Sequence, residues 1–322
     1  MERSHVYMVK KGKENMKSIK NIIKKIPGVL SLHRWAMHQL SIYWPAQATR
    51  ILYHRQMGRP LNLRNPQAFT EKIQWLKLNK YWRNPQVAQC ADKFAVRKYI
   101  EEKDCAELLT KLYGAWDSVS DINWDVLPEQ FVFKCNHGSG YNIVITDKKA
   151  TDKQVIMKQL DQWMHERYGV GSVEQGIYDN IKRKIIAEEF IQTADGQPPK
   201  DFKFFCADGK VKLLFVASDR KDGQTKFDYY YPNWEHIAVR NIFPNAGVIS
   251  KPVDLDKMII YAEKLSKGIP LVRVDFYNEA GRIYFGELTF THFGGLNGFE
   301  PDSYDFTFGK LLPDVQVWKM MK

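Results

Sequence analysis

The sequence predicts an α+β fold whose sheets are largely antiparallel. Segments with the apolar spacing of helices alternate with pairs of strands that short turns join. The strongest turn signal is Asp208-Gly209, which divides residues 200–219 into two apolar strands and is typical of a two-residue hairpin. Because the helical segments alternate with hairpins rather than with single strands, the pattern favours antiparallel sheets over repeated strand–helix–strand units.

The composition limits what the 322 residues can be. They are 44% hydrophobic and 13% aromatic, which supports a sizeable core rather than disorder. The formal charge of +11 favours acidic partners, such as phosphates, anionic lipids, carboxylated sugars or nucleic acid. No apolar run reaches the ~18 residues of a membrane span, and the N-terminus does not read as a signal peptide. The four cysteines lack metal-ligand spacing, so we expect a reduced, cytoplasmic protein.

Residues 1–34 hold most of the positive charge, with nine Lys or Arg against two Glu. Within them, apolar residues recur at helical spacing and lysines fall largely on the other side. Two interpretations are open: a cationic amphipathic helix on an anionic membrane, or a solvated helix that packs on its own domain. The aromatic residues Trp35, Tyr43 and Trp44 favour the membrane interface. We expect residues 1–59 to form a basic helical region.

Two helical segments are expected next, at residues 69–82 and 90–103. Asp92 is a plausible N-cap of the second helix, which places Lys93 in its first turn. A lysine there opposes the preference set by the helix dipole. The side chain of Lys93 therefore either points into solvent or meets an anionic ligand.

A glycine-rich loop, residues 137–140, separates two apolar strands, and Lys134 lies at the end of the first. This arrangement fits either a bent hairpin or a clamp over phosphates. A helix over residues 150–169 follows, with Thr151 or Asp152 as its cap.

The next strand ends in Glu188 and Glu189, which are either a simple strand end or part of an adenine site. Asp201 and Lys203 then alternate onto one face of a strand. There they form either a surface ladder of charges or part of a site. A helix over residues 254–268 precedes the last hairpin.

The last hairpin carries Arg273 and Asp275 on its first strand and Glu287 on its second. We expect a four-residue loop over residues 279–282 with Gly281 left-handed. That loop sets Arg273 opposite Glu287 and Asp275 diagonal to Glu287, at ~7–8 Å. Two carboxylates so placed can bridge one divalent cation. The alternative is an ordinary Arg–Glu ion pair on a solvated face, and a two-residue turn would move the carboxylates apart.

Other kinds of site find little support in the sequence. His137 and His292 lie in glycine-rich loops without the His, Cys or Asp companions of a zinc site. No nucleophile elbow or Walker A sequence is present.

The ordered set of motifs resembles the TupA-like ATP-grasp family. The segments that carry the resemblance are ADKFAVRKYI, FVFKCNHGSG, IIAEEFI, DFKFF, VRVDF and GELTFTHFGG, within about residues 60–315. The family is associated with teichuronopeptide, capsule and O-antigen biosynthesis, and its members are often labelled glycosyltransferases. The resemblance implies an ATP-grasp fold, in which two α+β lobes clamp ATP between antiparallel sheets. It implies a short helical pre-grasp region at 60–120, lobe A at 121–191 and lobe B at 192–322.

The resemblance also implies site residues. The implied ATP-binding residues are Lys93, Lys134, His137, Gly138, Ser139, Gly140, Glu188, Glu189, Phe190, Ile191, Asp201 and Lys203. The implied Mg²⁺ ligands are Asp275, Glu287 and Thr289, and the implied catalytic residues are Arg273, Lys134 and Lys203. Thr289 stands where the family usually has an asparagine, so a second ion would be held more weakly.

The function implied is an ATP-dependent carboxylate–amine ligase of cell-surface polysaccharide biosynthesis. Its expected partners are ATP, an anionic or lipid-linked glycan and an amino acid amine, without nucleic acid. Its expected location is the cytoplasm, with peripheral contact at the inner face of the membrane through residues 1–34. The alternatives are a kinase acting on a glycan hydroxyl, a glycosyltransferase and a non-catalytic membrane scaffold.

Overall fold

The computed structural model describes residues 29–219 and 225–321. The chain divides into two units, Met1–Ile51 and Leu52–Lys322. Helix α2 (Val29–Tyr43) lies in the first unit, and α3 (Pro45–Met57) runs across the boundary between the units. Most of the predicted amphipathic helix within residues 1–34 lies outside the described residues. Within the described part, none of the helices is both long and apolar enough to cross a membrane.

Helices and strands alternate along the second unit. The helices are α4 (Phe69–Leu76), the π-helix η1 (Lys77–Tyr81), α5 (Pro85–Ala91), α6 (Val96–Glu102), α7 (Lys153–His165), α8 (Gln175–Tyr178), α9 (Leu255–Ser266), α10 (Ser303–Leu311) and α11 (Val315–Met320). Short 3₁₀ helices are η2 (Ala106–Leu108), η3 (Val119–Asp121), η4 (Trp124–Val126), η5 (Val170–Ser172) and η6 (His292–Gly295). The strands are β1 (Leu112–Trp116), β2 (Phe131–Cys135), β3 (Asn142–Ile145), β4 (Ile185–Glu189), β5 (Asp201–Ala207), β6 (Lys210–Ser218), β7 (Lys226–Tyr230), β8 (His236–Ile237), β9 (Val272–Glu279) and β10 (Arg282–Thr289).

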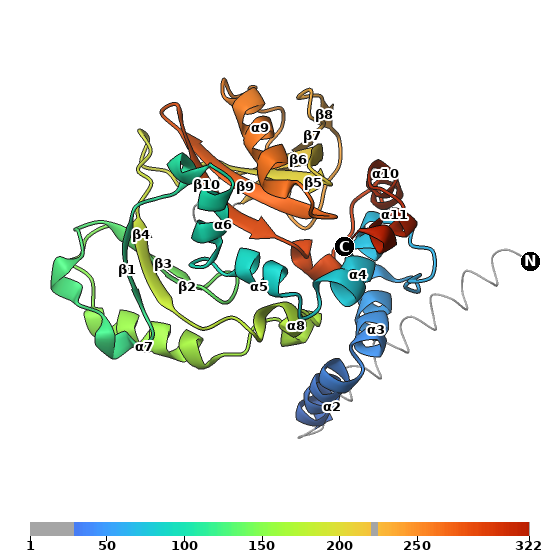
Figure 1. Cartoon of the computed structure of the whole chain (residues 1–322), viewed down its shortest axis with the longest axis horizontal. Helices are drawn as coiled ribbons and strands as arrows, with labels where there is room; N and C mark the ends of the chain where they lie inside the picture. The colour runs from blue at the N-terminus through green and yellow to red at the C-terminus, as the bar shows by residue number, and fades with distance from the viewer. Residues whose placement is uncertain (1–28, 220–224, 322) are drawn as a thin grey trace, which may run out of the picture. The chain divides into compact units, whose positions relative to one another are not determined.

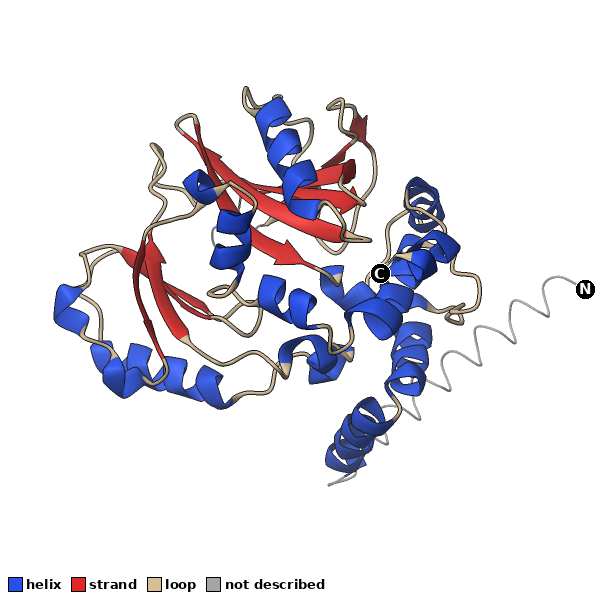
Figure 2. Ribbon diagram, viewed as in Figure 1, coloured by secondary structure: helices blue, strands red, loops and turns tan. Residues whose placement is uncertain are grey.

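The strands form two separate sheets, coloured red in Figure 2. Sheet A has the order β1-β4-β2-β3 and sheet B the order β10-β9-β5-β6-β7-β8 (Figure 1). Every strand pair in both sheets is antiparallel. The predicted α+β fold with antiparallel sheets is therefore confirmed.

Each sheet has its own apolar core, because the strands place alternate side chains on opposite faces. Sheet A buries Phe131 and Phe133 of β2, which contact Trp124 in edge-on and tilted arrangements, and α7 packs against β2. Asp152 is the N-cap of α7, as predicted. Its Oδ1 accepts from the backbone N–H groups of Gln154 (2.9 Å) and Val155 (3.3 Å). Sheet B packs against α9.

Two hairpins of sheet B, β5–β6 and β9–β10, have turns of two residues. The Asp208-Gly209 turn has left-handed φ angles of 47° and 70°, as its residue types predict. The expectation of a four-residue loop in the last hairpin is wrong. Strand β9 ends at Glu279 and β10 begins at Arg282, and the turn between them is Ala280-Gly281, with φ angles of 50° and 76°.

The carboxylates of this hairpin stay together in spite of the short turn, because β10 has a bulge at Gly286. Phe285 pairs with Phe276, and the next pair is Glu287 with Asp275, which leaves Gly286 without a partner. Without the extra residue, the side chain of Glu287 would point to the other face of the sheet. The predicted diagonal placement is therefore corrected: the two carboxylates lie directly opposite each other.

The expected position of Lys93 in a helix is also corrected. Helix α6 begins at Val96, and Lys93 lies in the turn that joins it to α5. Asp92 caps this turn, because its Oδ1 accepts from the N–H groups of Phe94 (2.7 Å) and Ala95 (3.1 Å). The capping signal was correct, but it belongs to a turn that precedes the helix.

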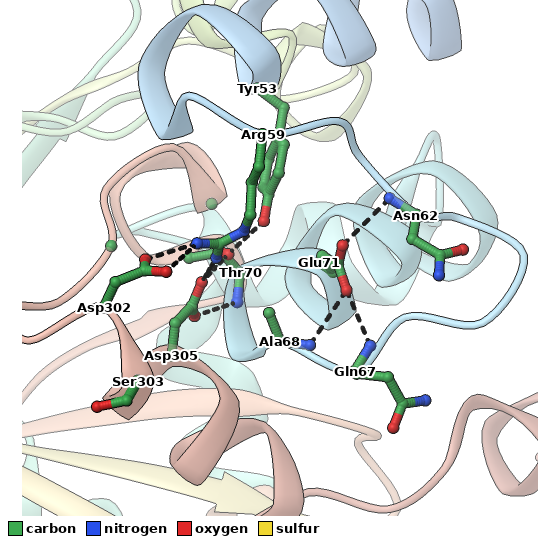
Figure 3. A network of polar contacts seen from close by, with 12 residues as sticks. Tyr53, Arg59, Asn62, Gln67, Ala68, Thr70, Glu71, Asp302, Ser303 and Asp305 are labelled. Carbon is green, nitrogen blue, oxygen red and sulfur yellow. Dashed lines mark hydrogen bonds and ion pairs between the residues drawn. The ribbon is translucent and has the colours of Figure 1, made fainter. Parts of the chain in front are cut away.

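A buried polar network joins α10 to the start of α4 (Figure 3). Asp305 accepts from the backbone N–H of Thr70 (2.9 Å), from its hydroxyl (2.6 Å) and from Arg59. Arg59 also pairs with the exposed Asp302, and the Thr70 hydroxyl contacts the hydroxyl of Tyr53 (2.8 Å). The network therefore connects residues more than 230 positions apart in the chain.

Replacing Asp305 by alanine should lower the free energy of unfolding by about 3 kcal/mol, because it leaves buried donors without an acceptor. The control is Asp302→Ala, which removes the other carboxylate on Arg59 but is 63% exposed, so we expect a loss of ~0–1 kcal/mol. Urea unfolding of both variants measures the difference. Equal losses would contradict a structural role specific to Asp305.

Candidate functional site

A cleft of about 620 Å³ opens between sheet A and sheet B. Its walls include the α5–α6 turn, the β2–β3 hairpin and the face of β5, β9 and β10 that carries the charged residues. Eleven of the sequence-predicted residues line it: Lys93, Lys134, Gly138, Ser139, Gly140, Asp201, Lys203, Arg273, Asp275, Glu287 and Thr289. Its volume falls in the range of ~300–1,000 Å³ that is typical of small-molecule sites.

Arg273 lies at the centre of the charged part of the cleft. Its Nε and Nη2 donate to the two oxygens of Asp275 (2.7 and 2.6 Å), and Nη2 also donates to Glu287 Oε1 (2.8 Å) and Thr289 Oγ1 (3.0 Å). Its Nη1 lies 2.7 Å from His292 Nδ1. In the β9–β10 ladder, Arg273 pairs with Thr289 and Asp275 pairs with Glu287. The register of the two strands therefore brings these four side chains together.

Lys203 brings a second cation to the same carboxylates. It is the ladder partner of Asp275, to which its Nζ donates, and it also lies 2.6 Å from Asp201 Oδ2. Burial alone would raise the pKa of Glu287, but the positive charges of Arg273, Lys203 and Lys93 outweigh it and lower the pKa to about 2. Glu287 therefore stays ionised at neutral pH, with a side chain one-third exposed to the cleft.

Two further lysines line the opposite wall. Lys134 Nζ donates to Glu188 Oε2 (2.6 Å), and Arg97 Nη1 donates to the other oxygen (3.1 Å). Lys93 Nζ donates to the carbonyl of Gly138, and within the described chain no carboxylate lies within ion-pair distance of it. Burial lowers the pKa of Lys93. This partly desolvated cation therefore points at the glycine-rich loop and can accept an anion beside it.

The remaining predicted residues lie apart from the cleft surface. Glu188 lines a small adjoining pocket with Lys134 and Arg97. Glu189 accepts from the N–H of Lys111 (3.1 Å) in sheet A. Phe190 and Ile191 are half-buried in the segment that follows β4 and, like Glu189, are not among the cleft-lining residues.

His137 is a core residue in this structure. Its ring is buried, lies 5.4 Å from the ring of Tyr141, and places Nε2 3.1 Å from the carbonyl of Trp163. Burial is the main cause that lowers the pKa of His137, so the neutral form is favoured. His137, the first residue of the glycine-rich loop, is therefore packed against Tyr141 and Trp163 and is not among the residues that line the cleft.

Asn136 was missed by sequence reasoning although it holds the lysine-bearing turn in place. Its Nδ2 donates to Asp92 Oδ1 (2.8 Å) and to the carbonyl of Lys182 (3.0 Å), and its Oδ1 accepts from the N–H of Lys184 (2.7 Å). Its carbonyl accepts from the N–H of Lys93 (3.2 Å). In the sequence, a lone asparagine beside a glycine-rich loop is most simply interpreted as a turn residue. No local pattern points to its hydrogen-bond partners, because they lie over 40 residues away.

Sequence reasoning also missed a group of buried polar residues that lies at the cleft. Glu174 is buried and accepts from the hydroxyls of Ser172 and Thr291. The buried Lys77, in the π-helix η1, donates to the carbonyls of Ser172 (2.9 Å) and Gly294 (3.3 Å). Burial lowers the pKa of Lys77 to about 8. These contacts anchor the left-handed turn at Gly294, whose N-terminal neighbours line the cleft.

The donor set suits a polyphosphate together with a divalent cation. Asp275, Glu287 and Thr289 offer oxygen ligands, which Mg²⁺ prefers, and four cations surround them. The described residues contain no group of three His, Cys, Asp or Glu arranged for a metal. Mg²⁺ does not need one, because it is commonly held by one or two carboxylates and substrate phosphates.

A known protein family and several solved structures are similar to this chain. A model of the family described as TupA-like ATPgrasp matches residues 71–313. A search of curated proteins found no match. Among solved structures, D-alanine–D-alanine ligase from Bacillus anthracis complexed with ATP is 16% identical, with a TM-score of 0.38 over 62% of this chain and 54% of that one. N5-carboxyaminoimidazole ribonucleotide synthetase from Thermus thermophilus is 10% identical (TM-score 0.36; 62% and 45%). The ATP-grasp ligase PsnB with minimal precursor, Mg and ADP is 10% identical (TM-score 0.36; 69% and 58%). The chain spans about half the length of the solved structures it matches.

Proposed function

The chain belongs to the TupA-like ATP-grasp family, as its ordered motifs predicted, and from this premise we propose that it is an ATP-dependent carboxylate–amine ligase. The observation that carries the proposal is that one cleft is lined by four cations, Lys93, Lys134, Lys203 and Arg273, together with the carboxylates of Asp275 and Glu287. Such a set can neutralise a triphosphate and position its terminal phosphorus.

In this proposal the nucleotide lies between two lobes, residues 121–191 and 192–322, with residues 60–120 as the pre-grasp region. Lys93, Lys134 and Lys203 contact the phosphates, and the loop of residues 138–140 lies over them. Asp201 approaches the ribose. The segment of Glu188, Glu189, Phe190 and Ile191 frames the adenine, which requires it to approach the cleft when the nucleotide binds.

The chemistry follows from the poor reactivity of a carboxylate towards an amine. A carboxylate oxygen attacks the γ-phosphorus of ATP, the bond to ADP breaks, and an acylphosphate forms. The amine then attacks the acyl carbon, phosphate leaves with the bonding electrons, and the amine nitrogen loses a proton. Arg273 is placed to stabilise the transferring phosphoryl group. Mg²⁺ held by Asp275 and Glu287 would supply charge neutralisation when bound.

We assign the carboxylate to a uronic acid or an amino acid used in cell-surface polysaccharide synthesis. The support is the resemblance to proteins of teichuronopeptide, capsule and O-antigen biosynthesis. The partners proposed are ATP, an anionic or lipid-linked glycan and an amino acid amine. The basic composition, +11 in all, suits such an anionic substrate.

The test is to incubate the protein with Mg-ATP, a uronate and an amino acid. The proposal expects ADP and free phosphate in equal amounts only when both substrates are present. ADP with a stable phosphorylated sugar and no amide would instead support a kinase. Protection against heat by a nucleotide-sugar but not by Mg-ATP would support a glycosyltransferase. Unchanged ATP binding after Lys134→Ala would support a non-catalytic scaffold.

We also propose that the N-terminal region makes peripheral contact with an anionic membrane at its cytoplasmic face. Leu32, Trp35 and Tyr43 lie within one face of α2 and are exposed, and Trp44 follows them. Aromatic side chains of this kind favour the lipid interface, and the basic residues within residues 1–34 favour anionic headgroups.

Deleting residues 1–34 should abolish sedimentation of the protein with vesicles that contain phosphatidylglycerol. Vesicles of phosphatidylcholine alone are the control, because they lack the negative surface charge and should bind only weakly. Retained binding of the truncated protein to anionic vesicles would contradict the membrane proposal.

A further inference from the structure

The cleft contains a group of aromatic side chains that the ATP and metal assignments do not use. We call this group, Phe215, Phe227, Phe243 and Phe293, the aromatic patch. All four line the cleft. The ring of Phe227 lies 4.6 Å from that of Phe215, 4.6 Å from that of Phe243 and 6.2 Å from that of Phe293, measured between centroids. The four rings therefore form one packed group, in which Phe215 and Phe227 are buried and Phe243 and Phe293 are half-buried.

The aromatic patch adjoins the charged centre directly. Across sheet B, Phe215 of β6 pairs with Lys203 of β5, Lys203 pairs with Asp275 of β9, and Asp275 pairs with Glu287 of β10. The guanidinium carbon of Arg273 lies 5.8 Å from the centre of the Phe215 ring. A ligand that rests on the aromatic patch can therefore place one of its groups beside Arg273.

The aromatic patch itself carries no charge. The four cations that line the described part of the cleft, Lys93, Lys134, Lys203 and Arg273, belong to the charged centre and the opposite wall. A titratable neighbour is His292, whose ring lies 4.2 Å from that of Phe293. Its Nδ1 faces Arg273, and burial together with that positive charge holds its pKa well below the ordinary value. An uncharged ring fits this surface better than a phosphate does.

The same cleft is also lined by groups suited to the edge of a polar ring. Tyr168 and Tyr178 are among them, and their rings pack edge to face at 4.8 Å. Ser172 and Asn297 also line the cleft and add polar groups. Aromatic side chains together with hydroxyl and amide groups in one cleft match a pyranose, which has apolar C–H faces and a rim of hydroxyls.

We propose that the aromatic patch binds the pyranose ring of the carboxylate substrate and directs its carboxylate towards Arg273. This inference rests on the proposed ligase function. The patch suits a sugar acid better than a nucleotide-sugar, since its four residues offer no cation for a diphosphate. Binding on the aromatic patch also keeps the substrate apart from the adenine. In the proposed function, the adenine lies beside the segment that follows β4.

The test compares Phe243→Ala with Phe306→Ala. Phe243 lines the cleft, whereas Phe306 is an exposed residue of α10 outside it and serves as the matched control. With methyl glucuronide as the probe substrate, Phe243→Ala should raise KM about tenfold. The dissociation constant of Mg-ATP should stay within about twofold, and Phe306→Ala should change neither. Unchanged KM in Phe243→Ala, or weaker Mg-ATP binding instead, would overturn the proposal.

Binding without turnover separates this inference from the ligase function. Saturation-transfer NMR should detect methyl glucuronide and methyl glucoside bound to the wild-type protein and lose both signals in Phe243→Ala. If those signals appear but no amide forms, the sugar site stands and the ligase proposal fails. If amide forms from an acyclic carboxylate and neither sugar binds, the ligase stands and the sugar site fails. A signal from UDP-glucose stronger than that from either glycoside would also overturn the sugar-acid assignment.

Discussion

Replacing Glu287 by glutamine is expected to lower the turnover number by about a thousandfold, or ~4 kcal/mol of barrier. Glutamine keeps the size of the side chain and can still accept from Arg273 and Thr289, as Oε1 of Glu287 does. It removes the negative charge that a low pKa of about 2 keeps in place at neutral pH. The fold should therefore survive while the site loses its affinity for a divalent cation.

Steady-state release of ADP at increasing Mg²⁺ concentration measures this effect. The matched control is Glu279→Gln, which changes a carboxylate on the same hairpin that does not line the cleft. We expect the control to retain wild-type rates. Turnover within twofold of wild type in Glu287→Gln would show that this carboxylate is not a metal ligand.

Replacing Arg273 by methionine is expected to reduce turnover by about 10³–10⁵-fold, the range found for arginines that stabilise a transferring phosphoryl group. The same change should destabilise the protein by about 3–5 kcal/mol, because it leaves the buried Asp275 with one cation instead of two. The loss of activity could then reflect unfolding alone. A second variant is needed to separate the two effects.

The double variant Arg273→Met/Asp275→Asn makes that separation when it is compared with Asp275→Asn alone, since Asp275 is itself a proposed Mg²⁺ ligand and both variants lack its charge. We expect urea unfolding to show that much of the lost stability returns while activity does not. Arg282→Met is the control, because Arg282 is exposed on the same hairpin. Equal activity in the double variant and in Asp275→Asn alone would mean that Arg273 has only a structural role.

The elements that could be predicted are those with local signals. The Asp208-Gly209 turn, the Asp152 cap of α7 and the strands around the glycine-rich loop each depend on residues a few positions apart. The bulge at Gly286 has no such signal. A Cβ at this position would lie 3.1 Å from the carbonyl oxygen of Asp275, so the need for glycine is set by a close approach across the hairpin.

The candidate site shows the same division. Motif order was enough to select Lys93, Lys134, Arg273 and the two carboxylates, because residue type and sequence order carry the chemistry of phosphate and metal binding. It could not show that Glu188 pairs with Lys134 and Arg97, since 54 and 91 residues separate those partners. Nor could it show that His137 is buried, with its ring next to Tyr141 and its Nε2 beside the carbonyl of Trp163.

The sequence by itself determined the α+β fold, the order of its elements and the kind of chemistry that its polar residues can support. Those properties depend on apolar periodicity, turn residues and charge, which act over short stretches of chain. Only the tertiary structure decided which charges meet, through a bulge that places Asp275 opposite Glu287 and through Asn136, which holds the turn of Lys93. It also placed an uncharged aromatic patch beside Arg273. Such contacts depend on the packing of distant strands, which no local pattern encodes.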